Sequence, residues 1–181
     1  MISSVCVFCG SSTKVDRIYK DEAATLGTEI ARRGITLVYG GGDVGTMGSL
    51  ASAAMDSGGE VIGIIPEYLN ERVRHLPLTQ LMIVKGMHER KAAMQEKADA
   101  FIALPGGIGT MDEFFEIWTL RYIGLHRKPI GLLNINGFYD VLIEFLHVMN
   151  AQSFLQTQVL SELCIETSSA AMLDALAETQ N

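Results

Sequence analysis

Short apolar runs alternate with longer amphipathic stretches along the whole chain, and this alternation limits the fold more than any other feature of the sequence. The runs are rich in Val, Ile, Leu and Phe, as buried strands are. They predict strands at residues 2–9, 35–39, 61–65, 81–84, 100–104, 129–133 and 163–166. The longer stretches predict helices at residues 17–33, 46–57, 87–97, 110–124, 138–150 and 168–178, while residues 67–79 read as irregular.

The predicted strands are continuously apolar, which is typical of a parallel sheet with helices on both faces. Right-handed crossovers between such strands build a doubly wound, Rossmann-like α/β fold. A chain of 181 residues suits one domain of this kind, so we expect a single domain over residues 1–181. In doubly wound folds, ligands bind at the carboxyl ends of the strands, and a functional site is expected there.

Charge and composition argue against several classes of protein. The formal net charge is −7, which disfavours a nucleic-acid-binding protein, because such proteins usually carry a basic face. No apolar stretch reaches the roughly 18 residues of a membrane-spanning helix. No basic segment precedes an apolar run as in a signal peptide, so we expect a cytoplasmic protein.

The three cysteines, Cys6, Cys9 and Cys164, are too few for a disulfide framework. Cys6 and Cys9 form a C-x-x-C motif, but zinc would need a second ligand pair with similar spacing. A strand would also turn these two side chains to opposite faces. We interpret both as buried apolar residues and expect no metal and no cofactor.

Three glycine-rich segments follow predicted strands and lead toward helices, at residues 10–12, 40–48 and 105–110. Free backbone N–H groups and the helix dipole favour an anion at a helix start, and glycine lets the backbone approach it. One such segment is often only a tight turn. Three of them at one edge of a sheet indicate a phosphate site.

Two common nucleotide motifs describe these segments poorly. Gly40, Gly42 and Gly45 match G-x-G-x-x-G, but they follow the second strand and not the first. The acidic residue about 20 positions further on, Glu67, lies after a proline instead of in its usual place. No Gly-Lys-Ser/Thr follows the glycines, which disfavours a Walker A loop and ATP hydrolysis.

Chemically competent side chains open two predicted helices at the same edge of the sheet. Residues 87–91 read Met-His-Glu-Arg-Lys, and residues 110–113 read Thr-Met-Asp-Glu. Carboxylates in a first helical turn often only stabilise the helix. The functional hypothesis is that Glu113 faces a ligand cavity while Asp112 points away. Glu116 and Thr119 would then continue the Glu113 stripe along the helix.

Four segments together resemble the LOG ("lonely guy") family of cytokinin riboside 5′-monophosphate phosphoribohydrolases, many of which were once described as lysine decarboxylases. Residues 105–113 match the family motif P-G-G-x-G-T-x-x-E, and residues 87–91 are similar to its M-H-x-R-K motif. Residues 40–48 resemble its G-G-x-x-G-x-M-G loop, and residues 128–134 resemble its K-P-[VI]-G-L-L-N strand. The resemblance covers nearly the whole chain.

This resemblance implies hydrolysis of the N-glycosidic bond of a nucleoside 5′-monophosphate, which releases the free base and ribose 5-phosphate. It implies Arg90 and Glu113 as the catalytic pair. The resemblance and the glycine segments together give the candidate substrate-binding residues, which are Gly10, Ser11, Ser12, Gly41, Gly42, Gly45, Glu71, Met87, His88, Lys91, Gly106, Gly107, Ile108, Gly109, Thr110, Met111, Asp112 and Thr119.

General chemistry supports the roles of the catalytic pair. Breaking a ribosyl C–N bond builds positive charge on the sugar, which a carboxylate such as Glu113 stabilises, or it activates water. Arg90 can orient that carboxylate and bind ligand oxygens. His88 alone is more often a hydrogen-bonding residue at a helix start than an acid. A lysine decarboxylase would need pyridoxal phosphate on a Schiff-base lysine, and no lysine stands out in such a setting.

Alternatives to this reading remain. The same fold could serve a non-catalytic carrier of a nucleotide or of the molybdenum cofactor, or a nucleosidase of broader substrate range. Leu120 and Tyr122 replace a Trp and a Gln that are frequent in the family, which leaves the base and its N6 substituent open. The resemblance and the apolar load of residues 114–125 predict a homodimer built largely on the helices at residues 87–97 and 110–125.

Overall fold

All seven predicted apolar runs form strands in the computed structural model, which describes residues 2–73 and 75–179. The strands are β1 (Ser4–Phe8), β2 (Thr36–Tyr39), β3 (Val61–Pro66), β4 (Gln80–Val84), β5 (Ala100–Ala103), β6 (Ile130–Leu133) and β7 (Leu163–Glu166). The helices are α1 (Arg17–Arg32), α2 (Gly45–Asp56), α3 (Glu67–Asn70), α4 (Met87–Lys97), α5 (Ile108–Tyr122), α6 (Asp140–Ala151), α7 (Thr157–Ser161) and α8 (Ser169–Thr179), with a 3-10 turn η1 (Ile135–Gly137) after β6.

The strands form one sheet in the order β4-β3-β2-β1-β5-β6-β7, and every neighbouring pair is parallel. The chain winds outward from β1 to β4, returns to the centre and continues from β5 to β7. This confirms the doubly wound, Rossmann-like α/β prediction. The reversal between β1 and β5 is the topological switch point, at which such sheets bind ligands.

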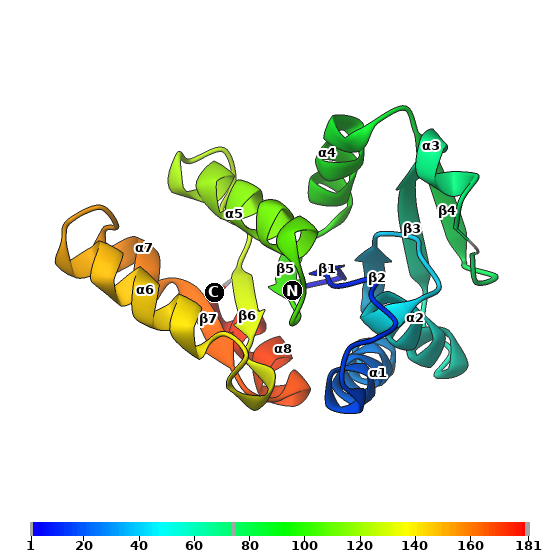
Figure 1. The fold of residues 1–181 in the computed structure, drawn as a ribbon, viewed down its shortest axis with the longest axis horizontal. Coiled ribbons are helices and arrows are strands. Elements are labelled where there is room, and N and C mark those ends of the chain that lie inside the picture. Colours follow the sequence, from blue (N-terminus) through cyan, green and yellow to red (C-terminus); the bar gives the residue numbers. More distant parts are fainter. Residues whose placement is uncertain (1, 74, 180–181) are drawn as a thin grey trace.

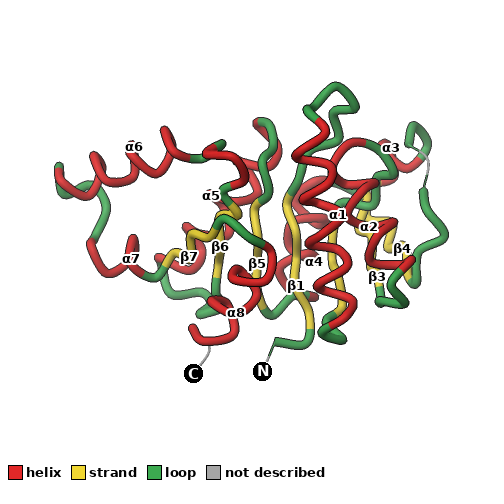
Figure 2. Tube along the Cα trace, turned by 90° about the horizontal axis from the view of Figure 1, so that it is seen from below, coloured by secondary structure: helices red, strands yellow, loops and turns green. Residues whose placement is uncertain are grey.

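Helices cover both faces of the sheet, as the apolar strands predict. One layer holds α1, α2 and α8, and the other holds α4, α5 and α6 (Figure 1). Figure 2, seen from below, has the first of these layers on the near side of the strands. Leu26 and Leu50 fill one core, and Met94, Phe114 and Trp118 fill the other.

Strand β1 divides its side chains between these two cores. Cys6 packs with the α4 and α5 layer, and Cys9, just after the strand, packs with the α1 and α2 layer. The prediction that the C-x-x-C cysteines point to opposite faces and are buried is confirmed, and both are free thiols. Burial raises the pKa of the Cys9 thiol to about 12, which keeps it protonated.

Three short elements were not predicted from the sequence. Helix α3 lies in the segment predicted to be irregular, and α7 and η1 lie between predicted elements. A helix of four or five residues has too few turns to show a repeating apolar pattern. Helix α5 begins at Ile108, two residues before its predicted start, because Gly107 is its N-cap and the next glycine continues the helix.

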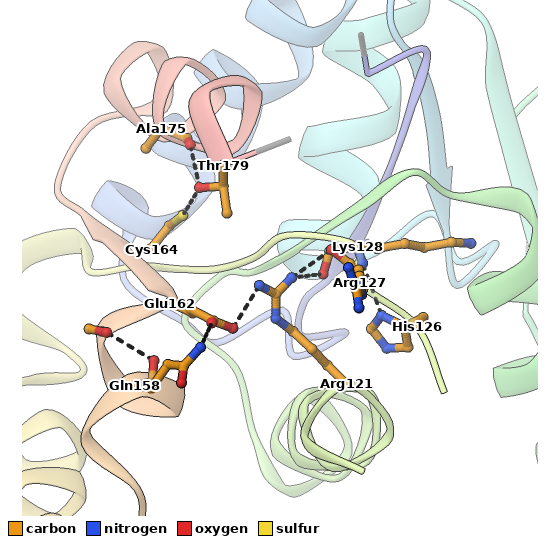
Figure 3. A network of polar contacts seen from close by, with 10 residues as sticks. Arg121, His126, Arg127, Lys128, Gln158, Glu162, Cys164, Ala175 and Thr179 are labelled. Atoms are coloured by element: carbon orange, nitrogen blue, oxygen red, sulfur yellow. Dashed lines mark hydrogen bonds and ion pairs between the residues drawn. The ribbon is translucent and has the colours of Figure 1, made fainter. Parts of the chain in front are cut away.

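A network of polar contacts fixes the carboxyl end of α5 to the amino ends of β6 and β7 (Figure 3). Arg121 Nη1 donates to the carbonyl oxygens of Arg127 and Lys128 at 2.8 and 2.7 Å. Its Nη2 donates to Glu162 Oε2 at 3.0 Å. These contacts anchor α5 at one edge of the sheet, so that its amino end lies at the opposite edge, beside the switch point.

No helix of residues 2–73 and 75–179 combines the length and the apolar character that crossing a membrane requires.

Candidate active site

A cavity of about 330 Å³ opens at the carboxyl edge of the sheet, where β1 and β5 end. Cavities that hold small organic ligands usually measure about 300–1,000 Å³. The lining residues come from the end of β1, from α2, and from the starts of α4 and α5. They are Cys9, Gly10, Ser11, Ser12, Met47, Met87, Arg90, Gly107, Gly109, Thr110, Asp112 and Glu113.

The glycines of the second glycine-rich segment support the first segment and do not themselves line this cavity. Thr46 Oγ1 accepts a hydrogen bond from the Gly10 N–H at 3.0 Å and donates one to the Gly10 carbonyl at 2.9 Å. Gly45 has φ 63°, and a Cβ there would lie 2.7 Å from the Ser11 carbonyl carbon. Only glycine permits this close approach of the two backbones.

Gly41 and Gly42 are buried. We predicted that Gly41, Gly42 and Gly45 contact a ligand directly. The structure does not place them for this, because other residues line the cavity. Gly45 holds the loop of Gly10, Ser11 and Ser12 in place instead, while Gly41 packs against Ile65 of β3.

The amino end of α5 presents backbone to the cavity. Gly107 is the N-cap in an extended conformation, and a Cβ on Gly107 or on Gly109 would point into open space. The first N–H groups of a helix have no partner within the helix, and the helix dipole adds positive potential there. This end of the cavity therefore suits an anion such as a phosphate.

Arg90 of α4 and Glu113 of α5 meet at the cavity wall. Arg90 Nη2 lies 3.4 Å from Glu113 Oε1, and the two side chains are only 8% and 7% exposed. Arg90 Nη1 contacts the Met87 sulfur at 3.8 Å, and its buried Nε has no hydrogen-bond partner among the described residues. Arg90 also lines the cavity, which brings its guanidinium beside a ligand bound there.

Burial raises the pKa of the Glu113 carboxyl above its ordinary value, although the Arg90 guanidinium opposes this shift. A carboxyl group with a raised pKa can exchange a proton closer to neutral pH than an exposed glutamate can. The sequence prediction places Glu113 at the cavity, and the structure brings it there together with Arg90.

Lys91, a predicted substrate-binding residue, turns away from the cavity toward α5. Its ammonium forms ion pairs with Asp112, at 3.2 Å, and with Glu116. The Glu116 hydrogen bond raises the pKa of Lys91, which keeps the amine charged. Lys91 thus joins α4 to α5. The prediction that Asp112 points away is partly right, because Asp112 borders the cavity while its carboxylate pairs with Lys91.

Several predicted residues lie outside the cavity. Glu71 is exposed after α3, His88 is exposed on α4, and Gly106 packs against the Thr110 side chain. Ile108, Met111 and Thr119 line a separate groove on the outer side of α5.

The prediction that Thr119 lies on the same face of α5 as Glu113 is wrong. Six residues along a helix rotate the side-chain direction by about 240°. The Glu113 stripe runs instead through Ile117 and Leu120, which border a small cavity with it. Thr119 faces outward and donates to the Phe115 carbonyl at 2.7 Å.

Cys9 and Met47 line the cavity but were not among the predicted site residues. Met47 is the methionine of the segment that resembles G-G-x-x-G-x-M-G, and that motif was the available signal. Cys9 follows β1 directly, and its position at a strand end was the corresponding signal. Both add apolar surface to the cavity lining.

The residues present do not fit pyridoxal phosphate. That cofactor needs a lysine amine within the cavity, and the residues that line it include none. Lys91, which lies beside the cavity, is held by two carboxylates. Within residues 2–73 and 75–179, no group of three or more His, Cys, Asp and Glu side chains is placed to hold a metal ion.

The doubly wound sheet defines a Rossmann-like α/β protein, and the cavity at its switch point carries a buried arginine–glutamate pair. Residues 47–176 match the family described as "Possible lysine decarboxylase". The chain belongs to this family, which is the LOG family.

Curated relatives carry a more specific name. The chain is 48% identical over 152 residues to the cytokinin riboside 5′-monophosphate phosphoribohydrolase LOG of Oryza sativa subsp. japonica, which covers 83% of this chain. The present chain spans only 63% of the length of that rice protein. The cytokinin riboside 5′-monophosphate phosphoribohydrolase of Rhodococcoides fascians is 46% identical over 164 residues, covering 90% of this chain and 83% of its own.

Solved structures of lower identity share the fold. The molybdenum cofactor carrier protein of Chlamydomonas reinhardtii superposes with a TM-score of 0.76 at 18% identity, and the two chains cover 99% of each other. The molybdenum cofactor binding protein of Rippkaea orientalis gives a TM-score of 0.75 at 21% identity, covering 100% of this chain and 99% of its own. These likenesses establish the fold alone.

Proposed function

We propose that the protein hydrolyses the N-glycosidic bond of adenosine 5′-monophosphate or an N6-substituted derivative, releasing the base and ribose 5-phosphate. The observation that carries this proposal is the buried Arg90–Glu113 pair beside the amino end of α5. The printed names of the rice and bacterial relatives support the same reaction.

The spacing along α5 suits a ribose 5-phosphate. Glu113 lies five residues after Ile108, which is about 7.5 Å along the helix axis. That distance is comparable with the length of the sugar phosphate between its phosphorus and its anomeric carbon. One rigid helix would therefore hold the phosphate at its first turn and place the Glu113 carboxylate beside the bond that breaks.

Glu113 would act on the developing sugar cation. As the C–N bond breaks, positive charge builds on the anomeric carbon, and a nearby carboxylate stabilises it or accepts a proton from the attacking water. The buried position strengthens this interaction, because water screens it less than it would at the surface.

Arg90 would hold Glu113 in its reactive orientation and donate to ligand oxygens. Its Nη2 lies beside the carboxylate, and the residue also lines the cavity. The exposed hydroxyl groups of Ser11 and Ser12 border the same cavity and would complete the contacts to the ligand.

The alternative hypothesis is a non-catalytic carrier of a nucleotide or of the molybdenum cofactor. Only the fold favours it, because the molybdenum cofactor proteins are at most 21% identical to this chain. A carrier has no need for a buried carboxylate held by an arginine at the ligand site.

We also propose that the protein forms a homodimer. Large apolar side chains are exposed on α5 at Ile108, Phe115 and Tyr122, and on α6 at Val141 and Phe145. Patches of this kind are typical of interfaces between proteins. Of its described residues, α4 exposes no large apolar side chain, so α6 replaces α4 in the predicted interface. The cytoplasmic location and the single domain over residues 1–181 stay predictions.

A substrate panel tests the reaction. Purified protein is incubated with AMP, isopentenyl-AMP, GMP, CMP and adenosine, and the products are identified by chromatography and mass. We expect free base and ribose 5-phosphate from AMP or isopentenyl-AMP and little release from adenosine, because the phosphate is the main anchor. Comparable turnover of adenosine and AMP would contradict the proposed anchor, and no release from any nucleotide would favour the carrier.

A further inference from the structure

Gly40 is buried directly after β2 and faces the guanidinium of Arg90. A Cβ on Gly40 would overlap Arg90 Nη2 and would lie 3.4 Å from Arg90 Cζ. On the other side it would lie 3.3 Å from the terminal methyl group of Met47. No open space therefore remains for a side chain at this position.

The backbone of Gly40 does not itself require glycine. Its φ is not among the positive values that Gly41 and Gly45 adopt, so other residues can take its conformation. What glycine provides here is room. This separates Gly40 from Gly45, whose positive φ and close backbone contacts both exclude a side chain.

The room at Gly40 is occupied by the atom that pairs with Glu113. Arg90 Nη2 both lies against Gly40 and approaches Glu113 Oε1 to 3.4 Å. A methyl group on residue 40 would therefore push the same nitrogen out of its position beside the carboxylate. The backbone of the sheet can stay in place, because the overlapping atom is the far end of a flexible side chain.

We propose that Gly40 is a positioning residue, which places Arg90 against Glu113 by leaving the space that the guanidinium occupies. This rests on the proposed function, in which Arg90 orients the carboxylate that acts on the sugar. Gly40 is not among the residues that line the cavity. A Cβ at this position would meet Arg90 Nη2 first, and the Met47 methyl group only at a tight contact.

The first experiment measures packing without any reference to activity. Gly40→Ala is made in the native chain, in Arg90→Ala and in Arg90→Lys, both of which lack Nη2, and melting temperatures are compared. We expect Gly40→Ala to lower the melting temperature of the native chain by about 2–4 °C, because a buried overlap must be relieved. In the two Arg90 variants the loss should disappear or reverse, since Gly→Ala at a compatible site stabilises a chain. Equal shifts in all three backgrounds would overturn the proposal.

The second experiment measures turnover of AMP. We expect Gly40→Ala to lower kcat about tenfold or more while KM changes less than about threefold, because the misplaced arginine affects the reacting end and not the phosphate anchor. The matched control is Gly86→Ala, at the N-cap of α4, where a Cβ meets open space and φ is −157°. An unchanged kcat in Gly40→Ala, or an equal fall in Gly86→Ala, would overturn the positioning role.

The two experiments separate this proposal from the proposed function. A native protein without activity on AMP would overturn the proposed function and the positioning role together. The melting temperatures would still decide whether Gly40 makes room for Arg90.

Discussion

Arg90 Nη2 on α4 lies 3.4 Å from Glu113 Oε1 on α5, and less than a tenth of either side chain is exposed. Two further contacts hold the same helices together, where Lys91, the residue after Arg90, pairs with Asp112 and with Glu116 on either side of Glu113. Breaking a buried pair leaves an uncompensated charge, so the pair depends on both partners. The outer Lys91 contacts keep the two helices at the spacing that the inner pair requires.

Glu113→Gln is expected to lower kcat by about 10²–10⁴ while the protein stays folded. The amide keeps the size of the side chain and some hydrogen bonding, but it neither stabilises a cationic sugar nor takes a proton. Steady-state kinetics with AMP and a circular dichroism spectrum provide the measurement. Asp112→Asn is the matched control and should cost little, because Lys91 keeps Glu116 as a partner. Equal losses in both variants would show that the carboxylates act only through the electrostatics of the helix start.

Arg90→Lys is expected to reduce activity nearly as much as Arg90→Ala. Lysine keeps the positive charge but lacks the forked donors that reach a carboxylate and a ligand together. The measurement is kcat/KM for AMP in the native protein and both variants. Near-native activity of Arg90→Lys would mean that charge alone suffices and that the fork geometry has no role.

The pH profile of kcat/KM should show a fall in activity on the acid side, with its midpoint above the ordinary glutamate pKa of about 4.3. Burial raises the pKa of Glu113, the charges of Arg90 and Lys91 lower it, and those of Asp112 and Glu116 raise it again. The proposed reaction needs the ionised carboxylate, so activity falls as the pH falls through this raised pKa. The residual activity of Glu113→Gln should lack this fall, and a fall that survives in this variant would assign it to another group.

The contribution of Glu113 to the stability of the protein depends on pH in the opposite sense to its contribution to activity. Because its pKa is higher in the folded chain than in the unfolded chain, folding favours its protonated form. This contribution is fully present below the unfolded pKa and is lost as the pH rises through the folded value.

Asp99→Asn should destabilise the native protein most at neutral pH. Although burial opposes its ionisation, hydrogen bonds from the N–H and hydroxyl groups of Ser3 and Ser4 lower the pKa of Asp99. These bonds join the amino ends of β1 and β5. The stability they add is present above the unfolded pKa and is lost as the pH falls through the lower folded pKa. Melting temperatures between pH 7 and pH 3 should therefore converge for the two proteins. A constant difference would contradict this assignment.

Phe115→Glu and Phe145→Glu are each expected to shift the proposed dimer toward monomer, because a charge is costly at an apolar interface. Both side chains are exposed, on α5 and on α6. Light scattering at micromolar concentration measures the mass. Ile18→Glu on α1, also an exposed apolar position, is the control and should stay dimeric. A monomeric native protein would rule out the proposal.

The position of Glu113 at the amino end of α5 follows from local sequence, because the motif at residues 105–113 combines a strand end, a glycine turn and a helix start. The contact of Arg90 with Glu113 does not follow from local sequence, since α4 and α5 are separate segments that only packing brings together. The sequence predicts Lys91 and Thr119 at the same site, but side-chain direction depends on helix rotation. Lys91 turns to two carboxylates of α5, and Thr119 faces outward.

By itself, the sequence determined the seven apolar strands, the parallel sheet and the edge that carries the site, because strand burial and glycine turns are properties of short segments. Only the tertiary structure decided that Gly45 supports the loop of Gly10 and that Gly40 makes room for Arg90. These relationships join residues from different strands and helices, and their geometry depends on distances of a few ångströms between packed elements. No periodicity or motif spacing carries that information, because side-chain contacts across a core form only when the whole sheet and its helices are assembled.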